Sequence, residues 1–111
     1  MARISINYIK CFNQQEETSG NDEIYFRLDD QGGTNASYES DVMEGFKLGK
    51  TVYPGVVYEY TGSVGLQLWE YDPNNSHELL GEHTFSNTPS GTSVAGFYDY
   101  NSEYWIEYTI G

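Results

Sequence analysis

Side chains that carry oxygen are concentrated in one short segment of this chain, residues 70–78. The segment holds three carboxylates and two amides, those of Glu70, Asp72, Asn74, Asn75 and Glu78. Crowded carboxylates repel one another, and a hard cation such as calcium neutralises them by taking Asp, Glu, Asn and backbone oxygens as ligands. The same residue types also form ordinary solvated turns. The segment is therefore either a cation-binding loop or a solvated hairpin turn.

A second acidic cluster lies closer to the N-terminus, where Glu16 and Glu17 are followed after a short gap by Asp22 and Glu23. Loops that are distant in sequence can meet at one end of a β-sandwich and share an ion. Calcium takes about six to eight oxygen ligands, and the two clusters together offer enough. We therefore expect one calcium site, with ligands drawn from Glu16, Glu17, Asp22, Glu70, Asp72, Asn74 and Glu78.

Strand patterns recur along the whole chain, and no window has the apolar spacing of a helix. The clearest strands cover residues 4–12, 22–28, 64–69, 79–85, 93–98 and 103–110, with less regular ones at 36–42, 50–53 and 56–61. The apolar phase of the first strand shifts near Tyr8, which predicts a bulge. Two antiparallel sheets packed face to face bury these faces most simply. The sequence thus predicts an all-β antiparallel sandwich of about eight strands, of Greek-key type.

Length and charge restrict the possible functions. The 111 residues predict a single domain, 1–111, with a formal net charge of −12 and only 5 Lys and Arg residues. Phosphate binding needs clustered Lys and Arg, so nucleic acid is excluded as a partner, and adsorption to a membrane is not expected without calcium. The charge favours cation binding or a basic partner.

The single cysteine and the N-terminal sequence give further expectations. Cys11 has no partner for an internal disulfide, and its strand setting predicts a small buried hydrophobe. The chain enters a strand pattern directly after Met1, without an apolar run of signal-peptide or membrane-spanning length. We expect the protein to be cytoplasmic or released without a cleaved signal peptide. Its edge strands leave a dimer formed by edge pairing open.

Two segments resemble a known family. Residues 20–28, Gly-Asn-Asp-Glu-Ile-Tyr-Phe-Arg-Leu, resemble the Gly-x-Asp-Pro-Tyr strand start of the C2 domain, the calcium and phospholipid module of protein kinase C and synaptotagmin. Residues 69–81 resemble that family's second calcium loop. In that loop a second acid follows the first by two residues and a third comes six residues later, a spacing that Glu70, Asp72 and Glu78 fit.

The resemblance implies a non-enzymatic, calcium-dependent interaction module, with Glu16 or Glu17 as the earlier ligand. The chain departs from the family in having Glu where the family has Asp at positions 70 and 78, and Glu23 where it has Pro. The basic strand that the family uses for phosphoinositides is absent from the sequence. The resemblance therefore implies calcium binding more directly than lipid binding.

Catalysis has little support in the residue pattern. The two histidines, His77 and His83, lack a third ligand at a spacing typical of zinc, and we expect His83 to face solvent. Nucleophile elbows, phosphate loops and Cys-His pairs are absent from the sequence. We therefore expect no enzyme activity.

Aromatic residues support the main alternative, a metal-independent module that binds a carbohydrate or protein through Tyr71 and Trp105. Tyr25, Tyr98 and Tyr100 are further candidates for outward-facing rings. Exposed rings stack on sugars and anchor protein interfaces, although most strand tyrosines fill half-buried faces. A third possibility is a structural or inhibitory domain whose acidic face docks a basic partner.

Overall fold

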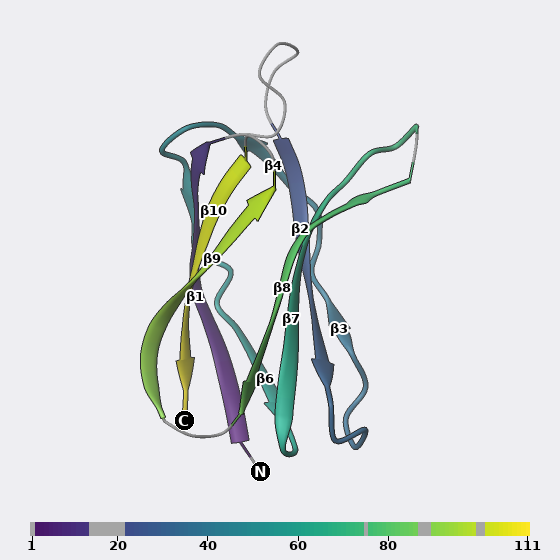
Figure 1. The fold of residues 1–111 in the computed structure, drawn as a ribbon, viewed down its shortest axis with the longest axis vertical. Coiled ribbons are helices and arrows are strands. Elements are labelled where there is room, and N and C mark those ends of the chain that lie inside the picture. Colours follow the sequence, from purple (N-terminus) through teal and green to yellow (C-terminus); the bar gives the residue numbers. More distant parts are fainter. Residues whose placement is uncertain (1, 14–21, 75, 87–89, 100–101) are drawn as a thin grey trace.

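Two antiparallel sheets pack face to face, which confirms the predicted all-β sandwich (Figure 1). The computed structural model describes residues 2–13, 22–74, 76–86, 90–99 and 102–111. These residues form ten strands: β1 (Ala2–Asn13), β2 (Asp22–Asp30), β3 (Tyr38–Glu39), β4 (Met43–Phe46), β5 (Thr51–Val52), β6 (Val56–Tyr60), β7 (Ser63–Glu70), β8 (Glu78–Ser86), β9 (Gly91–Asp99) and β10 (Ser102–Ile110).

The ten strands occupy eight positions, because two edge strands are interrupted. In sheet A, β5 and β6 both pair with β1, which is followed by β10 and then β9. In sheet B, β3 and β4 both pair with β2, which is followed by β7 and then β8. The estimate of about eight strands therefore holds for strand positions. The chain changes sheet at the connections β1–β2, β4–β5, β6–β7 and β8–β9, so neighbours in sequence often lie in opposite sheets.

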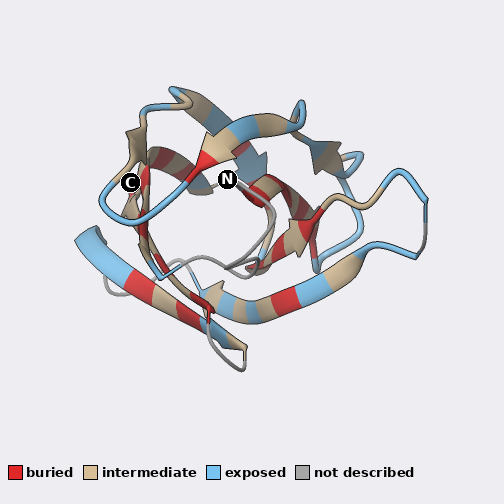
Figure 2. Cartoon of the chain, turned by 90° about the horizontal axis from the view of Figure 1, so that it is seen from above, coloured by how far each residue is buried: buried red, intermediate tan, exposed pale blue. Residues whose placement is uncertain are grey.

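The core lies between the two sheets and follows the period-two alternation of the strands. Figure 2 shows buried residues on the inward-facing parts of both sheets. In β1, Ile4 and Ile6 are buried and a register shift between Ile6 and Tyr8 moves the inward phase to Ile9 and Cys11, which confirms the predicted bulge. Cys11 is fully buried, as its setting predicted. The largest fully buried side chains are Tyr60, Tyr104, Phe26, Phe46 and Phe97.

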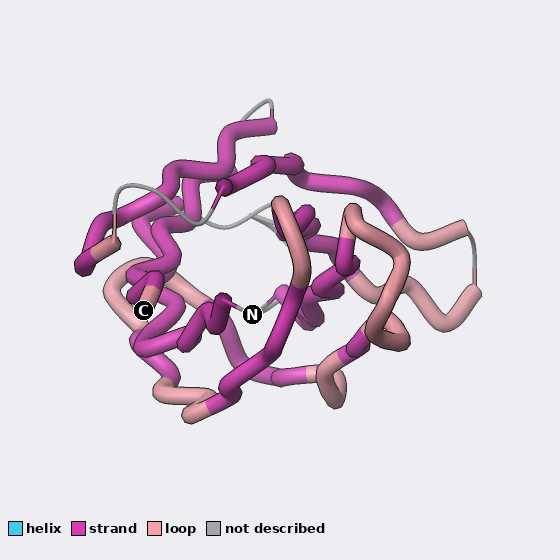
Figure 3. Tube along the Cα trace, turned by 90° about the horizontal axis from the view of Figure 1, so that it is seen from below, coloured by secondary structure: helices cyan, strands magenta, loops and turns pink. Residues whose placement is uncertain are grey.

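Asp30 ties together two turns at the end of the sandwich where both termini lie (Figures 1 and 3). Its carboxylate accepts hydrogen bonds from the backbone N–H groups of Gly32, Thr34, Asn35 and Thr61, at 2.9 to 3.2 Å. Burial alone would raise the pKa of Asp30, but these donors and the Thr61 hydroxyl outweigh it and hold the pKa far below its ordinary value. This acid is therefore a structural clamp.

The opposite end of the sandwich carries the connection from β7 to β8, the connection from β4 to β5, and the ends of β1, β2, β9 and β10 (Figure 1). Of the acidic residues predicted as ligands, Asp22, Glu70 and Glu78 lie at this end, and Asp72 lies in the β7–β8 connection that leaves it. No helix long and apolar enough to cross a membrane occurs in the part of the chain that the structure describes.

Candidate functional site

Four carboxyl groups from both sheets converge on this end, which we call the acidic end: Asp22, Glu70, Glu78 and Asp99. Asp22 begins β2, Glu70 ends β7, Glu78 begins β8 and Asp99 ends β9. Glu70 and Glu78 are paired across the β7–β8 ladder. Glu78 in turn hydrogen-bonds Asp99 in the other sheet and feels the charge of Asp22. Strand ends therefore bring together acids that are far apart in sequence.

The contact between Glu78 and Asp99 joins two carboxyl groups, so it requires a proton between them. The hydrogen bond with Asp99 is the main cause that raises the pKa of Glu78 from 4.5 to about 7, followed by burial and by the charges of Asp99 and Asp22. Asp99 Oδ2 is buried and accepts no hydrogen bond from the described residues. The pair therefore keeps its proton up to a pH of about 7, well above the range in which ordinary carboxyl groups lose theirs.

Asp22 is built into the base of the acidic end. It is 1 % exposed, and the hydroxyl of Tyr104 donates a hydrogen bond to its Oδ2. The ring of Tyr104 packs edge-on against Phe46, with ring centroids 5.8 Å apart. Burial, together with the negative charge of Asp22, raises the pKa of Tyr104, so this hydroxyl remains a donor across the physiological range. The buried tyrosine thus fixes the position of one carboxylate.

Local hydrogen bonds shape the β7–β8 connection, which projects away from the sandwich (Figure 1). Asp72 Oδ1 accepts the backbone N–H of Asn74 at 2.9 Å, an arrangement typical of an Asx turn. The N–H of Tyr71 donates to the carbonyl of Glu23 at 2.8 Å, which extends the contact with β2. Asn74 itself is exposed. The connection is thus both a hairpin turn and a carrier of carboxylate and amide oxygens.

Aromatic rings cover the outer face of sheet B beneath this connection. Tyr25 stacks on Trp69 with centroids 6.3 Å apart, and its hydroxyl lies 2.7 Å from Nδ1 of His77. Tyr25 faces outward as predicted, but it is only 8 % exposed because these neighbours cover it. The ring of Tyr71 packs against His77 at 4.8 Å. These rings hold the connection in place.

Trp105, the other predicted aromatic ligand residue, lies on the outer face of sheet A. Its ring packs against Phe12 at 4.5 Å, and its Nε1–H donates to Glu103 at 3.0 Å. Tyr98 is 63 % exposed and is the candidate ring that points most freely to solvent, while Tyr100 lies outside the described residues. The expected aromatic surface is therefore divided between two sheets.

The predicted calcium ligands divide into three groups. Asp22, Glu70 and Glu78 lie at the acidic end, and Asp72 and Asn74 lie in the connection that leaves it. Glu16 and Glu17 lie outside the described residues, between the end of β1 and the start of β2. The described residues alone contain no group of three or more His, Cys, Asp or Glu side chains arranged to hold a metal ion.

Sequence reasoning missed Asp99. Asp99 directly follows the predicted strand 93–98, but nothing in the sequence indicates that β9 and β8 are adjacent edges of opposite sheets. A similar miss concerns His83, expected to face solvent. Its Nε2 lies 2.6 Å from the carbonyl of Gly96, and its ring meets Phe97 edge-on at 4.8 Å. His83 therefore bridges the two sheets.

Comparison with solved structures identifies the architecture. The C2A domain of a plant extended synaptotagmin 1 superposes with a TM-score of 0.66 at 6 % identity, over 96 % of this chain and 90 % of that domain. A further structure, described as a C2 domain, superposes with a TM-score of 0.61 at 14 % identity, over 100 % of this chain and 99 % of the other. The fold is that of a C2 domain.

Two further structures match this chain over only part of their length. The chain spans 53 % of a structure of CC2D1B, with a TM-score of 0.70 at 10 % identity. It spans 17 % of the human GIVD cytosolic phospholipase A2, with a TM-score of 0.63 at 7 % identity. No family model matches the sequence, and no curated protein matches it. The likeness therefore establishes a C2-like fold, while function must be argued from the residues of this chain.

Proposed function

We propose that this chain is a non-enzymatic C2-type interaction module that binds calcium at its acidic end and uses the ion to gate contact with a protein, glycan or membrane surface. The observation that carries this proposal is the meeting of Glu78 with Asp99 and Asp22 at strand ends of the two sheets, with Glu70 paired to Glu78 across the β7–β8 ladder. All four side chains offer oxygen ligands, which is the donor type that calcium prefers. The C2-like fold supports the same proposal.

The donor types suit a hard cation, and a complete site would need ligands beyond the described residues. Glu70 and Asp22 are buried, so their carboxylates sit where a positive ion would interact strongly with them. Glu78 and Asp99 are close enough to share a proton, and a cation at the same place would neutralise them instead. Asp72 and Asn74 would contribute oxygens from the β7–β8 connection, and Glu16 and Glu17 from the segment before β2. When bound, the ion would supply charge neutralisation and join the two connections.

The direct test is thermal unfolding of the metal-stripped protein with and without millimolar calcium, with magnesium as the control. We expect a calcium-specific rise of the melting temperature, because a ligand that binds only the folded state stabilises it by RT ln(1 + [L]/Kd). If the dissociation constant lies a hundredfold below the calcium concentration, the stabilisation is about 2.7 kcal/mol.

A substitution at Asp72 separates ion binding from the turn. Asp72→Asn keeps an oxygen that can accept the Asn74 N–H, so the hairpin turn survives, but it removes a negative charge. We expect the variant to melt like the parent without calcium and below the parent with calcium. Asp41→Asn, an exposed acid away from this end, is the matched control. Equal melting of parent and Asp72→Asn in calcium would contradict the proposed role of Asp72.

A melting temperature that calcium does not move would favour the metal-independent alternative. In that case Tyr71 and Trp105 would be tested by binding to glycan and protein arrays in the presence of a chelator. Both rings already pack against neighbours, His77 and Phe12, so they would offer one face each to a ligand.

A further inference from the structure

One flank of the sandwich is open because both of its edge strands are interrupted at facing positions. In sheet B the edge breaks between β3 and β4, and in sheet A it breaks between β5 and β6. A hollow of about 190 Å³, which we call the flank groove, lies between the two breaks. It is lined by Phe26, Tyr38, Ser40, Asp41, Met43, Val52, Pro54 and Val56.

Local hydrogen bonds build the sheet B side of the break. Ser40 donates its backbone N–H to the carbonyl of Phe26, but the N–H of Phe26 is accepted by the hydroxyl of Ser40 and not by a backbone carbonyl. The same hydroxyl donates to the carbonyl of Asp41 at 3.0 Å. The Ser40 side chain thus ends the ladder between β2 and its edge strand, because it accepts the N–H of Phe26 in place of a backbone carbonyl. Its bond to the Asp41 carbonyl turns the chain outward. The interruption is therefore formed by the protein's own hydrogen bonds and does not require a ligand.

Residues of the facing edge enforce the second break. Pro54 has no N–H to continue a ladder, and Gly55 has φ of 68°, a conformation that favours glycine. Below the breaks, the hydroxyl of Tyr58 crosses between the sheets and donates to the carbonyl of Ala36 at 2.9 Å. Above them, backbone bonds join Gly49 and Lys50 to Cys11. The opening is therefore a short slot with fixed ends.

The size and lining of the slot restrict what it can hold. Ligand pockets for small molecules usually measure about 300 to 1,000 Å³, so a hollow of about 190 Å³ suits one inserted side chain better than a whole ligand. Its floor is the fully buried ring of Phe26, and most of its lining is apolar. Val42 and Tyr53 lie beside the breaks with exposures of 38 % and 75 %. The slot is therefore best suited to a single apolar side chain of a binding partner.

Charge restricts the partner further. Asp41 is the only charged residue among the described residues that line the groove, and it is exposed. Glu44 is exposed on the same edge, whereas Glu39 is already paired with Arg27 at 3.1 Å, and the whole chain has a net charge of −12. A second copy of this chain would bring the same negative charge to the interface, which disfavours a dimer there. A basic segment would be attracted instead.

We infer that the flank groove docks an extended segment of a basic partner protein, which inserts one apolar side chain between the half-buried Met43, Val52 and Val56 and places a neighbouring Lys or Arg beside Asp41. Extended segments commonly bind at open sheet edges, where pockets select alternate side chains. This site is separate from the acidic end, and its use requires no calcium.

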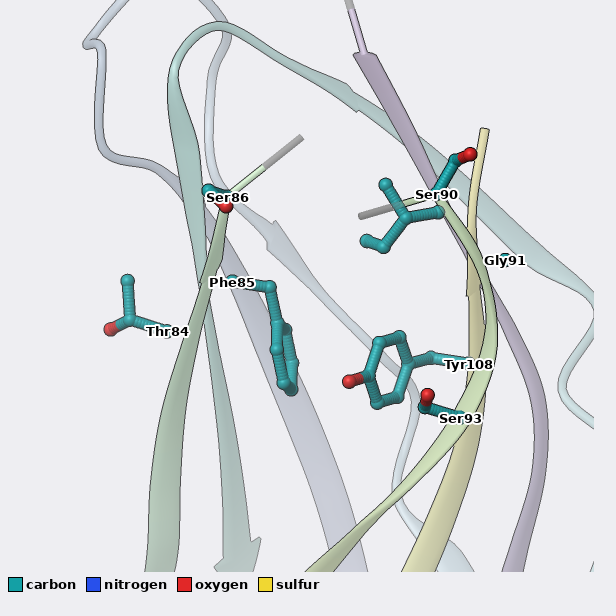
Figure 4. A pocket seen from close by; sticks show the side chains of 8 residues that line it. Thr84, Phe85, Ser86, Ser90, Gly91, Ser93 and Tyr108 are labelled. Carbon is teal, nitrogen blue, oxygen red and sulfur yellow. The ribbon is translucent and has the colours of Figure 1, made fainter. Parts of the chain in front are cut away.

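A second hollow, on the opposite flank, serves as an internal comparison. It measures about 250 Å³ and lies between β8 and β9, where Phe85 and Tyr108 face each other (Figure 4). The two rings stack with centroids 4.2 Å apart, so each ring already occupies the other's face. Its described lining residues include hydroxyl groups but no charged side chain. It therefore lacks the charge that selects a partner at the flank groove.

The test uses a phage-displayed library of random peptides, selected against the whole protein in EDTA so that calcium plays no part. We expect the enriched peptides to share an apolar residue next to Lys or Arg. Their affinities are then measured by calorimetry on the parent, on Asp41→Lys, on Val56→Trp and on Glu82→Lys. Glu82 is exposed on β8, at the other edge of sheet B, so Glu82→Lys makes the same charge change away from the groove.

The variants give distinct outcomes. Asp41→Lys should weaken binding by about fivefold, the effect of losing about 1 kcal/mol at an exposed charge pair. Val56→Trp fills the slot and should abolish binding, while Glu82→Lys should bind like the parent. Enrichment of peptides without Lys or Arg, an empty selection, or equal weakening by Asp41→Lys and Glu82→Lys would each overturn the inference. Asp41→Lys alters only an exposed side chain, so its result does not depend on how well Val56→Trp folds.

Discussion

The shared proton between Glu78 and Asp99 makes a prediction about stability in the absence of metal. Glu78→Gln replaces the protonated carboxyl group with an amide that can donate an N–H to Asp99 at every pH. In the parent, the raised pKa of Glu78 means that the folded state holds a proton that the unfolded chain releases. Stability from this proton is fully present below the unfolded pKa of 4.5 and is lost as the pH rises through about 7.

The size of the effect follows from the two pKa values. Moving the pKa of Glu78 from 4.5 to about 7 corresponds to at most about 3.4 kcal/mol, at about 1.36 kcal/mol for each pKa unit. Glu78 is partly exposed, and solvent screens its interaction with Asp99 and Asp22. We therefore expect the parent to lose about 1 to 2 kcal/mol between pH 5 and pH 8 through this group. Glu78→Gln should retain that stability.

The assay is urea unfolding of metal-free parent and Glu78→Gln across this pH range. The variant should match the parent at pH 5 and exceed it at pH 8. Glu82→Gln, an exposed change on the same strand, controls for the loss of one negative charge from a chain of net charge −12. If the free energies of unfolding of parent and Glu78→Gln differ by a constant amount from pH 5 to pH 8, the reasoning about a shared proton is wrong.

Three further substitutions test the framework of the sandwich. Tyr104→Phe removes the donor to buried Asp22 and should lower the free energy of unfolding by about 1 to 3 kcal/mol in urea titrations. Asp30→Asn should lower the urea midpoint at pH 7; because the pKa of Asp30 is depressed, the parent should lose this advantage as the pH falls below 3.8, the ordinary value. Gly81→Ala places a Cβ 2.8 Å from the ring of Phe97 and should destabilise the protein by about 1 to 3 kcal/mol, measured by thermal unfolding.

Most of the fold was predictable because period-two alternation is a local property. The inward face of β7, with Val64, Leu66 and Leu68 buried, follows directly from that alternation, and so does the phase shift near Tyr8. The interrupted edges were harder to define. The break at Pro54 has a clear local signal, whereas the break between β3 and β4 depends on the hydroxyl of Ser40, which is an ordinary residue in sequence.

The candidate site was predictable only in part, because strand ends have local sequence signals whereas contacts between the two sheets do not. Asp22, Glu70 and Glu78 stand next to apolar strands, so their place at strand ends could be inferred. Asp99 could not be added to them, because its meeting with Glu78 depends on which edges of the two sheets are adjacent. Which edges of the two sheets lie next to each other depends on the tertiary structure, and no periodic pattern in the sequence encodes it.

The described acids also show why a high negative charge can coexist with a compact sandwich. Asp30 is compensated by backbone N–H donors, and Asp22 receives the hydroxyl of Tyr104. Glu78 and Asp99 instead compensate each other by holding a proton, an arrangement that weakens as the pH rises. A carboxylate surrounded by N–H donors gains little from a cation, whereas two carboxyl groups that compete for a proton gain a great deal. Under the proposed function, calcium would therefore act at the acidic end and not at Asp30, whose buried carboxylate is already compensated by N–H donors.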